Sequence, residues 1–384
     1  MYLDALSILI YVLFLIYFLY TVEIFFGYRS IKYLDNLYEY TEDLSKISVI
    51  IPARNEEKKL EQALRSVLSS NYPSFEVIVV NDRSTDSTSE ILKRLQNDYS
   101  TLKIVEIDNV PEGWLGKNYA LQSGVSCASG NYYLFTDADV IMQKNTLRKA
   151  VSYCRLNNLD HIAVVPIINM PGLILKLFTA SFIIFFNMFA SPWKAKNPKS
   201  KKYIGIGAFN LVRSEVYKKT GGHEKIKLRP DDDMKLGKLI KSNGYKQETI
   251  FGKDLIEVNW YTSLKETFNG LLKNSYASVE YNFLNFFLSV IGLLFFCIFP
   301  FVSVFFCSGY ALLANIAIIL LIALRYLIIS KPHNIKVWYF VSFPFMTLMF
   351  LIIYCYSVFY TIIKGKIVWK DTSYSLAELK SNIV

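Results

Sequence analysis

Short apolar runs alternate with helix-like apolar stripes between residues 47 and 166. Short apolar runs bounded by polar clusters are typical of buried strands, whereas apolar residues three or four positions apart are typical of helices. The pattern predicts strands near 47–51, 75–80, 102–107 and 132–135, with helices near 60–68, from Asp86 and near 117–127. Strands separated by single helices make right-handed crossovers. The predicted fold class is therefore α/β, with a mainly parallel sheet and flanking helices.

Long uncharged stretches lie outside this region. Residues 5–22 carry no charge, and no Lys or Arg precedes them, so the sequence predicts a retained membrane anchor rather than a cleaved signal peptide. The stretches 283–306, 309–329 and 337–363 also have the length of membrane-spanning helices. Arg325 lies near the end of the second stretch, where its side chain can snorkel to the interface. Three such stretches so close together argue against buried helices of a soluble core.

Basic residues near the spans predict the orientation. Arg29 and Lys32 follow the first apolar stretch. Because cytoplasmic flanks are enriched in Lys and Arg, we expect region 30–280 to be cytoplasmic in a multi-pass protein of the cell membrane. Three further spans would place Lys364 and its neighbouring lysines outside. Either one stretch does not cross, as Pro300 would allow if 283–306 is re-entrant, or the charge rule fails here, and the sequence leaves both open.

The apolar pattern also divides the chain. The predicted regions are an anchor at 1–28, a cytoplasmic domain at 29–280, transmembrane helices at 281–364 and a tail at 365–384. Within the domain, the apolar segment 168–191 is broken by Pro171, Lys176 and Asn187. These interruptions favour a helix lying in the membrane interface over another span.

Charge and cysteine spacing narrow the functional classes. The net charge is +10, and five lysines crowd the segment 194–202 beside Trp193. A basic loop next to an apolar segment favours contact with anionic lipid headgroups over nucleic acid, and we expect no nucleic-acid partner. The cysteines show no metal or redox spacing. No third glycine follows Gly205-Ile-Gly207 in register and there is no Walker A motif, which disfavours a dehydrogenase and a P-loop ATPase.

Two carboxylates follow the strand that ends at Phe135. Asp137 and Asp139 are two positions apart, so in an extended segment they face the same way and can hold one ligand. Hard oxygen donors at this point suit Mg²⁺ or Mn²⁺ held against a diphosphate, and a solvated acidic turn is the alternative. Ligands bind outside the carboxyl ends of parallel strands. Polar clusters follow two other strands, at 53–56 and 81–84.

Several motifs occur in a fixed order. They are Ser48–Glu57, Val77–Asp86, Gly113–Asn118, the Asp137/Asp139 pair, Gly207–Arg213, Gly221–Glu224 and Asp232–Leu236. Together they resemble family 2 glycosyltransferases with the GT-A fold over roughly residues 46 to 275. The Gly-Trp-x-Gly-Lys variant and the tail Val368–Tyr374 resemble the membrane-bound branch that includes hopanoid-associated and carotenoid glycosyltransferases.

The resemblance implies a nucleotide-sugar donor, which has a base, a ribose, two phosphates and a sugar. Side chains after the first strand can hydrogen-bond the base and ribose, and the resemblance places Asp82 on the nucleotide. Turn formation and helix capping are the alternative, which we favour for Asp86. Lys117 opens a helix, where N–H groups already attract anions. The predicted donor-binding residues are Pro52, Ala53, Arg54, Asn55, Glu56, Asp82, Ser84, Lys117 and Asp137.

The acceptor needs a base, which the resemblance places in an acidic pair that opens a helix. Aligning on Leu236 makes Asp233 the base and puts Asp232 before it; the choice between the two stays open. Complementing the helix dipole is the alternative role. The acceptor-side candidates are Gly222, His223 and Trp114. His223 is as often structural, and Trp114 packs either on the sugar or into the protein.

We therefore predict an inverting, metal-dependent glycosyltransferase that moves a sugar from a cytoplasmic nucleotide-diphosphate sugar to a membrane lipid or lipid-linked acceptor. Inversion is implied by the resemblance. A processive polysaccharide synthase is one alternative, disfavoured because region 259–265 lacks a Gln-x-x-Arg-Trp run. A non-catalytic nucleotide-binding scaffold is another, disfavoured because the metal pair and the base are both present.

Overall fold

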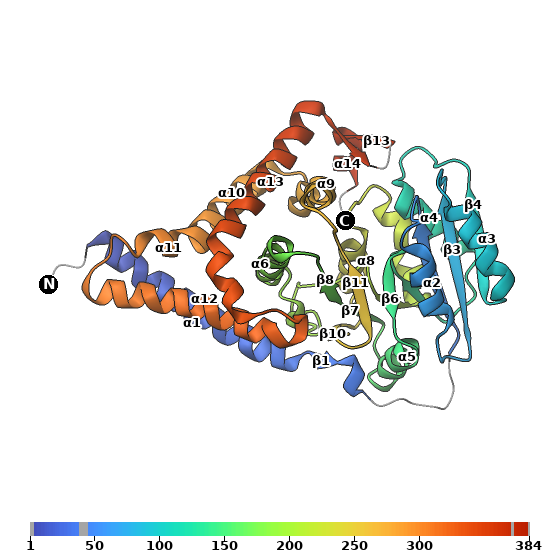
Figure 1. Cartoon of the computed structure of the whole chain (residues 1–384), viewed down its shortest axis with the longest axis horizontal. Coiled ribbons are helices and arrows are strands. Elements are labelled where there is room, and N and C mark those ends of the chain that lie inside the picture. The colour runs from blue at the N-terminus through green and yellow to red at the C-terminus, as the bar shows by residue number, and fades with distance from the viewer. Residues whose placement is uncertain (1–3, 38–44, 370–371, 383–384) are drawn as a thin grey trace. The chain divides into compact units, whose positions relative to one another are not determined.

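The computed structural model describes residues 4–37, 45–369 and 372–382, and the chain forms two compact units (Figure 1). Unit 1 comprises Met1–Ser30, Met170–Phe189 and Tyr261–Gly365. Unit 2 comprises Ile31–Asn169, Ala190–Trp260 and Lys366–Val384. Residues 261–280, which the sequence pattern assigned to the cytoplasmic domain, are grouped with the apolar helices of unit 1.

Unit 2 is built on an eight-stranded sheet. In spatial order the strands are β1 (Lys32–Tyr33), β10 (Gln247–Phe251), β7 (His161–Val165), β9 (Asn210–Arg213), β5 (Tyr132–Phe135), β2 (Ile47–Ala53), β3 (Phe75–Asp82) and β4 (Leu102–Ile107). β9 runs antiparallel to its neighbours β5 and β7, and all other pairs are parallel. The prediction of a mainly parallel α/β sheet is confirmed.

Helices cover both faces of this sheet. They are α2 (Leu60–Leu68), α3 (Thr88–Asp98), α4 (Gly116–Ser126), α5 (Thr146–Leu156), α7 (Ser214–Thr220) and α8 (Asp232–Ser242). Successive side chains of a strand point to opposite faces. Val49 and Ile51 of β2 accordingly join the core that contains Leu64 of α2, whereas Ile50 joins the core that contains Leu121 of α4. This two-sided burial explains the continuous apolar runs in the sequence.

Two smaller sheets complete unit 2. β6 (Val140–Met142) pairs antiparallel with β11 (Ile256–Asn259), which pairs parallel with β8 (Ile167–Asn169). Near the C-terminus, β12 (Lys366–Trp369) and β13 (Thr372–Ser375) form an antiparallel hairpin that is followed by α14 (Leu376–Ser381). The side chain and backbone of Ser375 exchange hydrogen bonds with Glu378, which caps α14.

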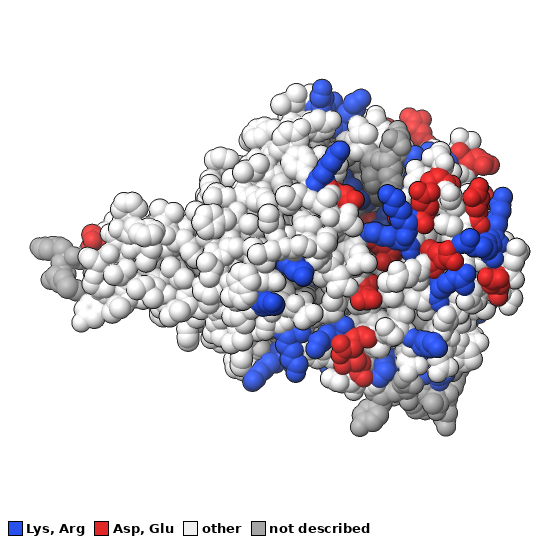
Figure 2. All heavy atoms as spheres, viewed as in Figure 1, with Lys and Arg blue, Asp and Glu red and all other residues white. Residues whose placement is uncertain are grey.

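Unit 1 is helical. Its helices are α1 (Ala5–Ser30), α6 (Leu173–Ala190), α9 (Leu264–Ser275), α10 (Phe283–Leu293), α11 (Phe299–Ser303), α12 (Gly309–His333) and α13 (Phe343–Lys364), with the last residue of α6 falling in unit 2. Five segments in the described residues are long and apolar enough to cross a membrane. Phe305, Phe306 and Ile363 are exposed. Figure 2 shows a largely uncharged surface over α10 and α11, as lipid contact requires.

The segment 283–303 is a broken helix. Pro300 has no N–H to donate to the carbonyl of Phe296. The chain widens there into a π-helical turn, η5 (Leu294–Ile298), and the Tyr17 hydroxyl donates to the Phe296 carbonyl. Arg325 of α12 also faces α1, because its Nε donates to Thr21 Oγ1 at 3.0 Å and its guanidinium lies 4.5 Å from the centre of the Tyr17 ring. Arg325 therefore packs between helices rather than snorkelling.

A buried carboxylate ties three segments of unit 2 together. Glu76 of β3 accepts hydrogen bonds from Ser48 Oγ at 2.7 Å, from the Ser129 backbone N–H at 2.8 Å and from Lys103 Nζ at 2.6 Å. Burial opposes ionisation, but these hydrogen bonds outweigh it and lower the pKa of Glu76 to about 2. The ionised carboxylate thus stabilises the fold.

Replacing Glu76 tests this contribution. We expect Glu76→Gln to lower the free energy of unfolding at pH 7 by about 1–3 kcal/mol, because an amide group would face the Lys103 ammonium. The folded-state pKa lies below the ordinary Glu value of about 4.3. The difference between wild type and variant should therefore be full above that value and shrink as the pH falls toward 2. Thermal unfolding of the full chain in detergent measures it, with exposed Glu90→Gln as the control; equal losses in both variants would contradict the assignment.

Candidate active site

The two carboxylates after β5 are each paired with a lysine. Asp137 Oδ1 lies 2.9 Å from Lys117 Nζ, at the start of α4. Asp139 Oδ2 lies 3.0 Å from Lys59 Nζ, which also donates to the carbonyl of Asn259 at 2.8 Å. These contacts connect the loop after β5 to the start of α4, to the start of α2 and to the end of β11.

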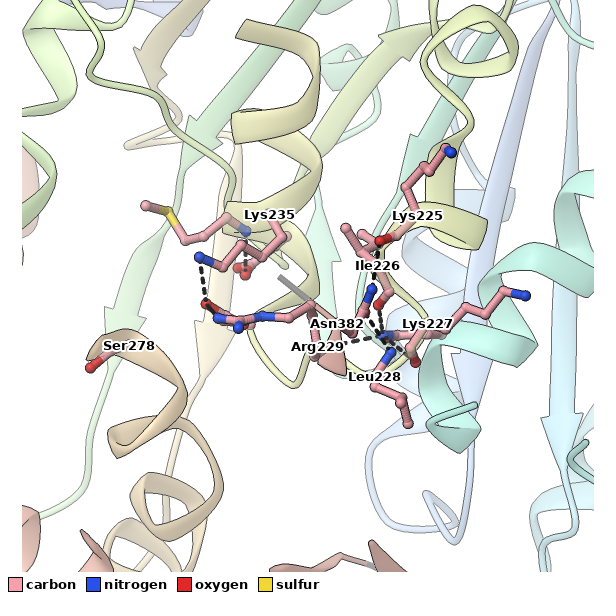
Figure 3. A network of polar contacts seen from close by, with 12 residues as sticks. Lys225, Ile226, Lys227, Leu228, Arg229, Lys235, Ser278 and Asn382 are labelled. Atoms are coloured by element: carbon pink, nitrogen blue, oxygen red, sulfur yellow. Dashed lines mark hydrogen bonds and ion pairs between the residues drawn. The ribbon is translucent and has the colours of Figure 1, made fainter. Parts of the chain in front are cut away.

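The three acidic residues Asp231, Asp232 and Asp233 at the start of α8 have different partners. Arg229 is fully buried and forms two hydrogen bonds with the Asp231 carboxylate, each at 2.9 Å. Asp232 Oδ1 lies 3.2 Å from Lys117 Nζ. Asp233 Oδ2 accepts from the Gly207 N–H at 2.8 Å. Figure 3 shows Arg229 and Lys235 at this turn. Asp231 is therefore a structural partner of Arg229, and the other two acids face the site.

Lys117 connects the two acidic groups. Its ammonium contacts both Asp137 and Asp232, so it bridges the loop after β5 and the start of α8. Burial alone would lower the pKa of Lys117, but Asp137, Asp232 and Asp233 raise it above its ordinary value. Burial, followed by the charge of Asp232, raises the pKa of Asp233. A raised pKa brings a carboxylate closer to the range that suits a general base.

A small cavity lies between these groups. Its walls are Lys117, Leu121, Phe135, Thr136, Asp137, Gly207, Asn210, His223, Asp232, Asp233 and Leu236. Gly207 allows the two acidic segments to meet here. A Cβ at this position would lie 2.6 Å from Asp137 Oδ2 and 3.5 Å from Asp233 Oδ2. The Gly207 carbonyl also accepts from the Asp137 N–H at 3.1 Å. Any larger residue would push Asp137 away.

The predicted nucleotide-side residues gather at the ends of β2 and β3. Pro52 and Ala53 close β2, and Asp82 closes β3. Asp82 is buried, accepts from Arg83 Nε at 2.7 Å and lies 3.7 Å from Arg54 Nη1. Two guanidinium groups therefore flank one carboxylate. The buried carboxylate of Asp82 is held in place before any ligand arrives.

Hydrogen bonds join the two loops that follow β2 and β3. The Asn55 N–H donates to Ser84 Oγ at 3.0 Å, and the Asn55 side chain accepts from the Thr85 N–H at 2.8 Å. The Glu56 N–H donates to Thr88 Oγ1 at 2.9 Å. Asp86 accepts from the Thr88 N–H at 3.0 Å, which is an Asx turn just before α3. The N-cap of α3 is Ser87, so Asp86 is a turn residue rather than the helix cap that the sequence favoured.

The acceptor-side candidates occupy different surroundings. His223 is buried, and its Nδ1 lies 2.8 Å from the Tyr217 hydroxyl, although its ring also forms part of the cavity wall. Gly222 has φ +48°, and a Cβ there would meet the Tyr217 ring. Trp114 lies outside the cavity, with Lys227 Nζ 5.0 Å from the centre of its ring. Only His223 of the three reaches the cavity.

Sequence reasoning missed four residues that the structure brings to the site. Gly207 was part of a motif without a role, although the spacing Gly-x-Gly signals a close backbone approach. Arg83 lay within a predicted polar cluster and Tyr374 ended the tail motif, but neither was given a role. Lys59 carried no signal that would separate it from surface lysines. Tyr374 comes from the C-terminal tail, and its hydroxyl accepts from the Gly116 N–H at 3.2 Å.

The donor set at Asp137 and Asp139 fits a hard divalent cation. The two side chains are 41% and 21% exposed, so both are accessible. Within the described residues no three His, Cys, Asp or Glu side chains cluster as a metal site. Mg²⁺ and similar ions are often held by one or two carboxylates together with substrate phosphates and water. The pair therefore suits a metal that arrives with a diphosphate.

Sequence comparison identifies proteins that are similar to this chain. Residues 48–221 match the sequence model of glycosyl transferase family 2. The chain is 29% identical over 201 residues to the 4,4'-diaponeurosporenoate glycosyltransferases of the Staphylococcus aureus strains USA300 and NCTC 8325. The match covers 51% of this chain and 51% of each relative, so the chain spans about half the length of these curated relatives.

A solved structure shares the fold. The mannosyltransferase PcManGT from Pyrobaculum calidifontis, in complex with GDP-Man and Mn²⁺, superposes with a TM-score of 0.57 at 17% identity. The superposition covers 92% of this chain and 99% of that structure. The predicted GT-A fold is confirmed.

Proposed function

We propose that this protein, whose residues 48–221 belong to glycosyl transferase family 2, transfers a sugar from a nucleotide-diphosphate sugar to a membrane lipid or lipid-linked acceptor. One observation carries the proposal. Asp137, Lys117 and Asp233 surround a single cavity at the carboxyl edge of a GT-A sheet, with Lys117 joining the acid after β5 to the helix that carries Asp233. These are the groups that a glycosyl transfer requires on its donor and acceptor sides.

The donor binds along the ends of β2, β3 and β5 in this proposal. Asp82 and the loop containing Arg54, Asn55, Glu56 and Ser84 take the base and ribose, because they lie together at these strand ends. Lys117 and the first amides of α4 take the diphosphate, because a helix N-terminus and an ammonium both favour phosphate. The PcManGT structure, which holds GDP-Man, supports a nucleotide-sugar donor. The 4,4'-diaponeurosporenoate glycosyltransferases support glycosyl transfer.

A divalent metal completes the donor side. Asp137 and Asp139 would hold Mg²⁺ or Mn²⁺, and the ion would neutralise the charge that develops on the leaving diphosphate. Lys59 and Lys117 are paired with these carboxylates in the structure. Both lysines have flexible side chains, so they are free to move onto other partners when the ion binds.

Asp233 acts as the base on the acceptor side. Its carboxylate is held by the N–H groups of Gly207 and Met234 and faces the cavity. It takes the proton of the acceptor hydroxyl as the hydroxyl oxygen bonds to the anomeric carbon. The bond from that carbon to the diphosphate breaks on the opposite side, which inverts the anomeric centre. Asp232 orients Lys117 rather than the acceptor.

The grouping of the chain into two units supports a proposed membrane topology. Residues 31–169 and 190–260 share one sheet, so both ends of α6 lie on one side of the membrane and α6 lies in the interface rather than crossing it. Residues 366–384 belong to the same unit, so the chain from 261 to 365 crosses an even number of times. The broken segment 283–303 is the best candidate for a re-entrant helix. Lys364 then lies inside with Arg29, and unit 2 is cytoplasmic.

Release of nucleoside diphosphate tests the proposal. Purified full-length protein is incubated with a panel of nucleotide-sugars and Mn²⁺, with and without a lipid extract of the host membrane. We expect one donor to be turned over, at least tenfold faster when the lipid extract is present. Equal release without lipid would indicate a hydrolase, and a lack of release with every donor would oppose a transferase.

A further inference from the structure

The amino end of α4 is lined by more polar groups than the proposed donor contacts use. Gly116, the first residue of α4, packs against the nucleotide side of the site. A Cβ at Gly116 would lie 2.5 Å from Asp82 Oδ2 and 3.3 Å from Arg83 Nη2. Only glycine therefore lets the start of the helix approach these two side chains.

Arg83 has an unused hydrogen-bond donor at this point. Its Nε donates to Asp82 Oδ1 at 2.7 Å. Its Nη2 is buried and has no hydrogen-bond partner in the part of the chain that the structure describes. Leaving a buried charged donor unpaired is costly, and such groups are satisfied by a ligand, an ion or water. Arg54 also flanks Asp82, so one carboxylate faces two guanidinium groups.

Tyr374 brings a second donor to the same place. It is 8% exposed, and its hydroxyl oxygen accepts from the Gly116 N–H at 3.2 Å. An accepting hydroxyl keeps its own hydrogen to donate, and the described residues provide no acceptor for it. The first amide of α4 is thus replaced at the helix end by an O–H group, which retains the affinity of that end for an anion.

The C-terminal tail is fixed at both ends of α14, so Tyr374 is firmly held. Asn382 accepts from the Leu228 N–H at 3.0 Å and donates to the Lys225 carbonyl at 2.9 Å, as Figure 3 shows. Leu379 of α14 is 1% exposed. From the other side, the side chain of Asn118 donates to the carbonyls of residues 226, 227 and 229. The tail, α4 and the loop before α8 therefore form one network.

We propose that Arg83 and Tyr374 form an anion subsite at the amino end of α4 that binds the diphosphate of the nucleotide-sugar. The subsite rests on the proposed function, because Asp82 beside it is the nucleotide contact in that proposal. The guanidinium of Arg83 forms charge-assisted hydrogen bonds with the phosphate oxygens, and the Tyr374 hydroxyl donates one more. A lipid phosphate has the same chemistry, but the position next to Asp82 favours a nucleotide.

Binding of nucleotides to the full chain tests the subsite without turnover. Dissociation constants for UDP, UMP, GDP, GMP and inorganic pyrophosphate are measured by titration calorimetry in lipid nanodiscs with Mn²⁺. We expect Arg83→Gln to weaken binding of the preferred nucleoside diphosphate about tenfold or more, and Tyr374→Phe about threefold to tenfold. The affinity for the nucleoside monophosphate should fall less, so the ratio of the two dissociation constants should become smaller in the variants. Arg83→Lys should fall between wild type and Arg83→Gln.

Matched controls separate the subsite from general damage. Exposed Arg94→Gln and Ser373→Ala, the latter next to Tyr374, should bind like wild type. Equal binding of nucleoside diphosphate by wild type and both test variants would overturn the subsite and leave the proposed function standing. Equal weakening of mono- and diphosphate would also overturn it, because the residues would then contact the nucleoside. Loss of pyrophosphate binding alone would assign the subsite to a free or lipid phosphate instead. If wild type binds neither nucleoside diphosphate, the proposed function fails as well.

Discussion

Asp233→Asn is expected to abolish transfer while leaving the donor site intact. The amide cannot take a proton from the acceptor hydroxyl, and a general base contributes roughly 10²–10⁴-fold to a rate. We therefore expect kcat to fall by about 10³. Binding of nucleoside diphosphate should stay within about threefold of wild type, because Asp233 is held by backbone N–H groups rather than by donor-side residues. Steady-state kinetics and calorimetry on the same preparation measure both quantities.

Asp232→Asn distinguishes the two acids that the sequence left open. Asp232 is paired with Lys117, so its loss should disturb donor binding and raise the KM of the nucleotide-sugar. The fall in kcat should be at least tenfold smaller than for Asp233→Asn. Exposed Asp108→Asn serves as the control and should change neither quantity. The reverse order of effects on kcat would assign the base to Asp232.

Asp139→Asn is expected to lose metal binding and, with it, most of the activity. A bound divalent ion is worth several kcal/mol to the leaving diphosphate, so losing one of its two carboxylate ligands should cost at least a hundredfold in kcat/KM, even at high Mn²⁺. Electron paramagnetic resonance of free Mn²⁺ in the presence of UDP and GDP reports metal binding independently of turnover. We expect wild type to take up Mn²⁺ and Asp139→Asn to take up far less.

A substitution of Lys59 is the control for the Asp139 variant, because it changes the partner of Asp139 and leaves the carboxylate in place. The Lys59 ammonium pairs with Asp139 in the structure, so Lys59→Met should leave Mn²⁺ binding equal to or tighter than in wild type. Chelation of the metal by EDTA should stop transfer by wild type and by Lys59→Met alike. Full activity of Asp139→Asn, or of wild type in EDTA, would show that the lysines rather than a metal serve the diphosphate.

The order of strands and helices between residues 47 and 135 was predictable because local patterns encode it. Buried parallel strands have continuous apolar runs, and α2 shows its buried stripe in Leu60, Leu64 and Val67. The end of β5 also placed Asp137 and Asp139 without any tertiary information. The grouping of residues 261–280 with unit 1 has no local signal, because it depends on contacts of α9 with α13, which is distant in sequence.

Contacts that span the chain account for what the sequence did not reveal. The role of Gly207 depends on β9 lying between β5 and β7, which brings Asp233 and Asp137 to within reach of one backbone segment. Tyr374 meets Gly116 from 258 positions away. Arg325 was expected to snorkel because only its distance from the end of the helix was known, and α1 supplies its partners Tyr17 and Thr21. No local pattern carries such information.

The most direct test of the account is to follow a radiolabelled sugar. Full-length protein in native membrane lipid is incubated with the turned-over nucleotide-sugar and Mn²⁺, and the label is counted in the organic extract, in the insoluble polymer and in the aqueous phase. The account predicts metal-dependent label in the organic extract, absent from the Asp233→Asn and Asp139→Ala variants. Label that appears only in insoluble polymer, or in the organic extract of both variants at the wild-type level, would contradict it.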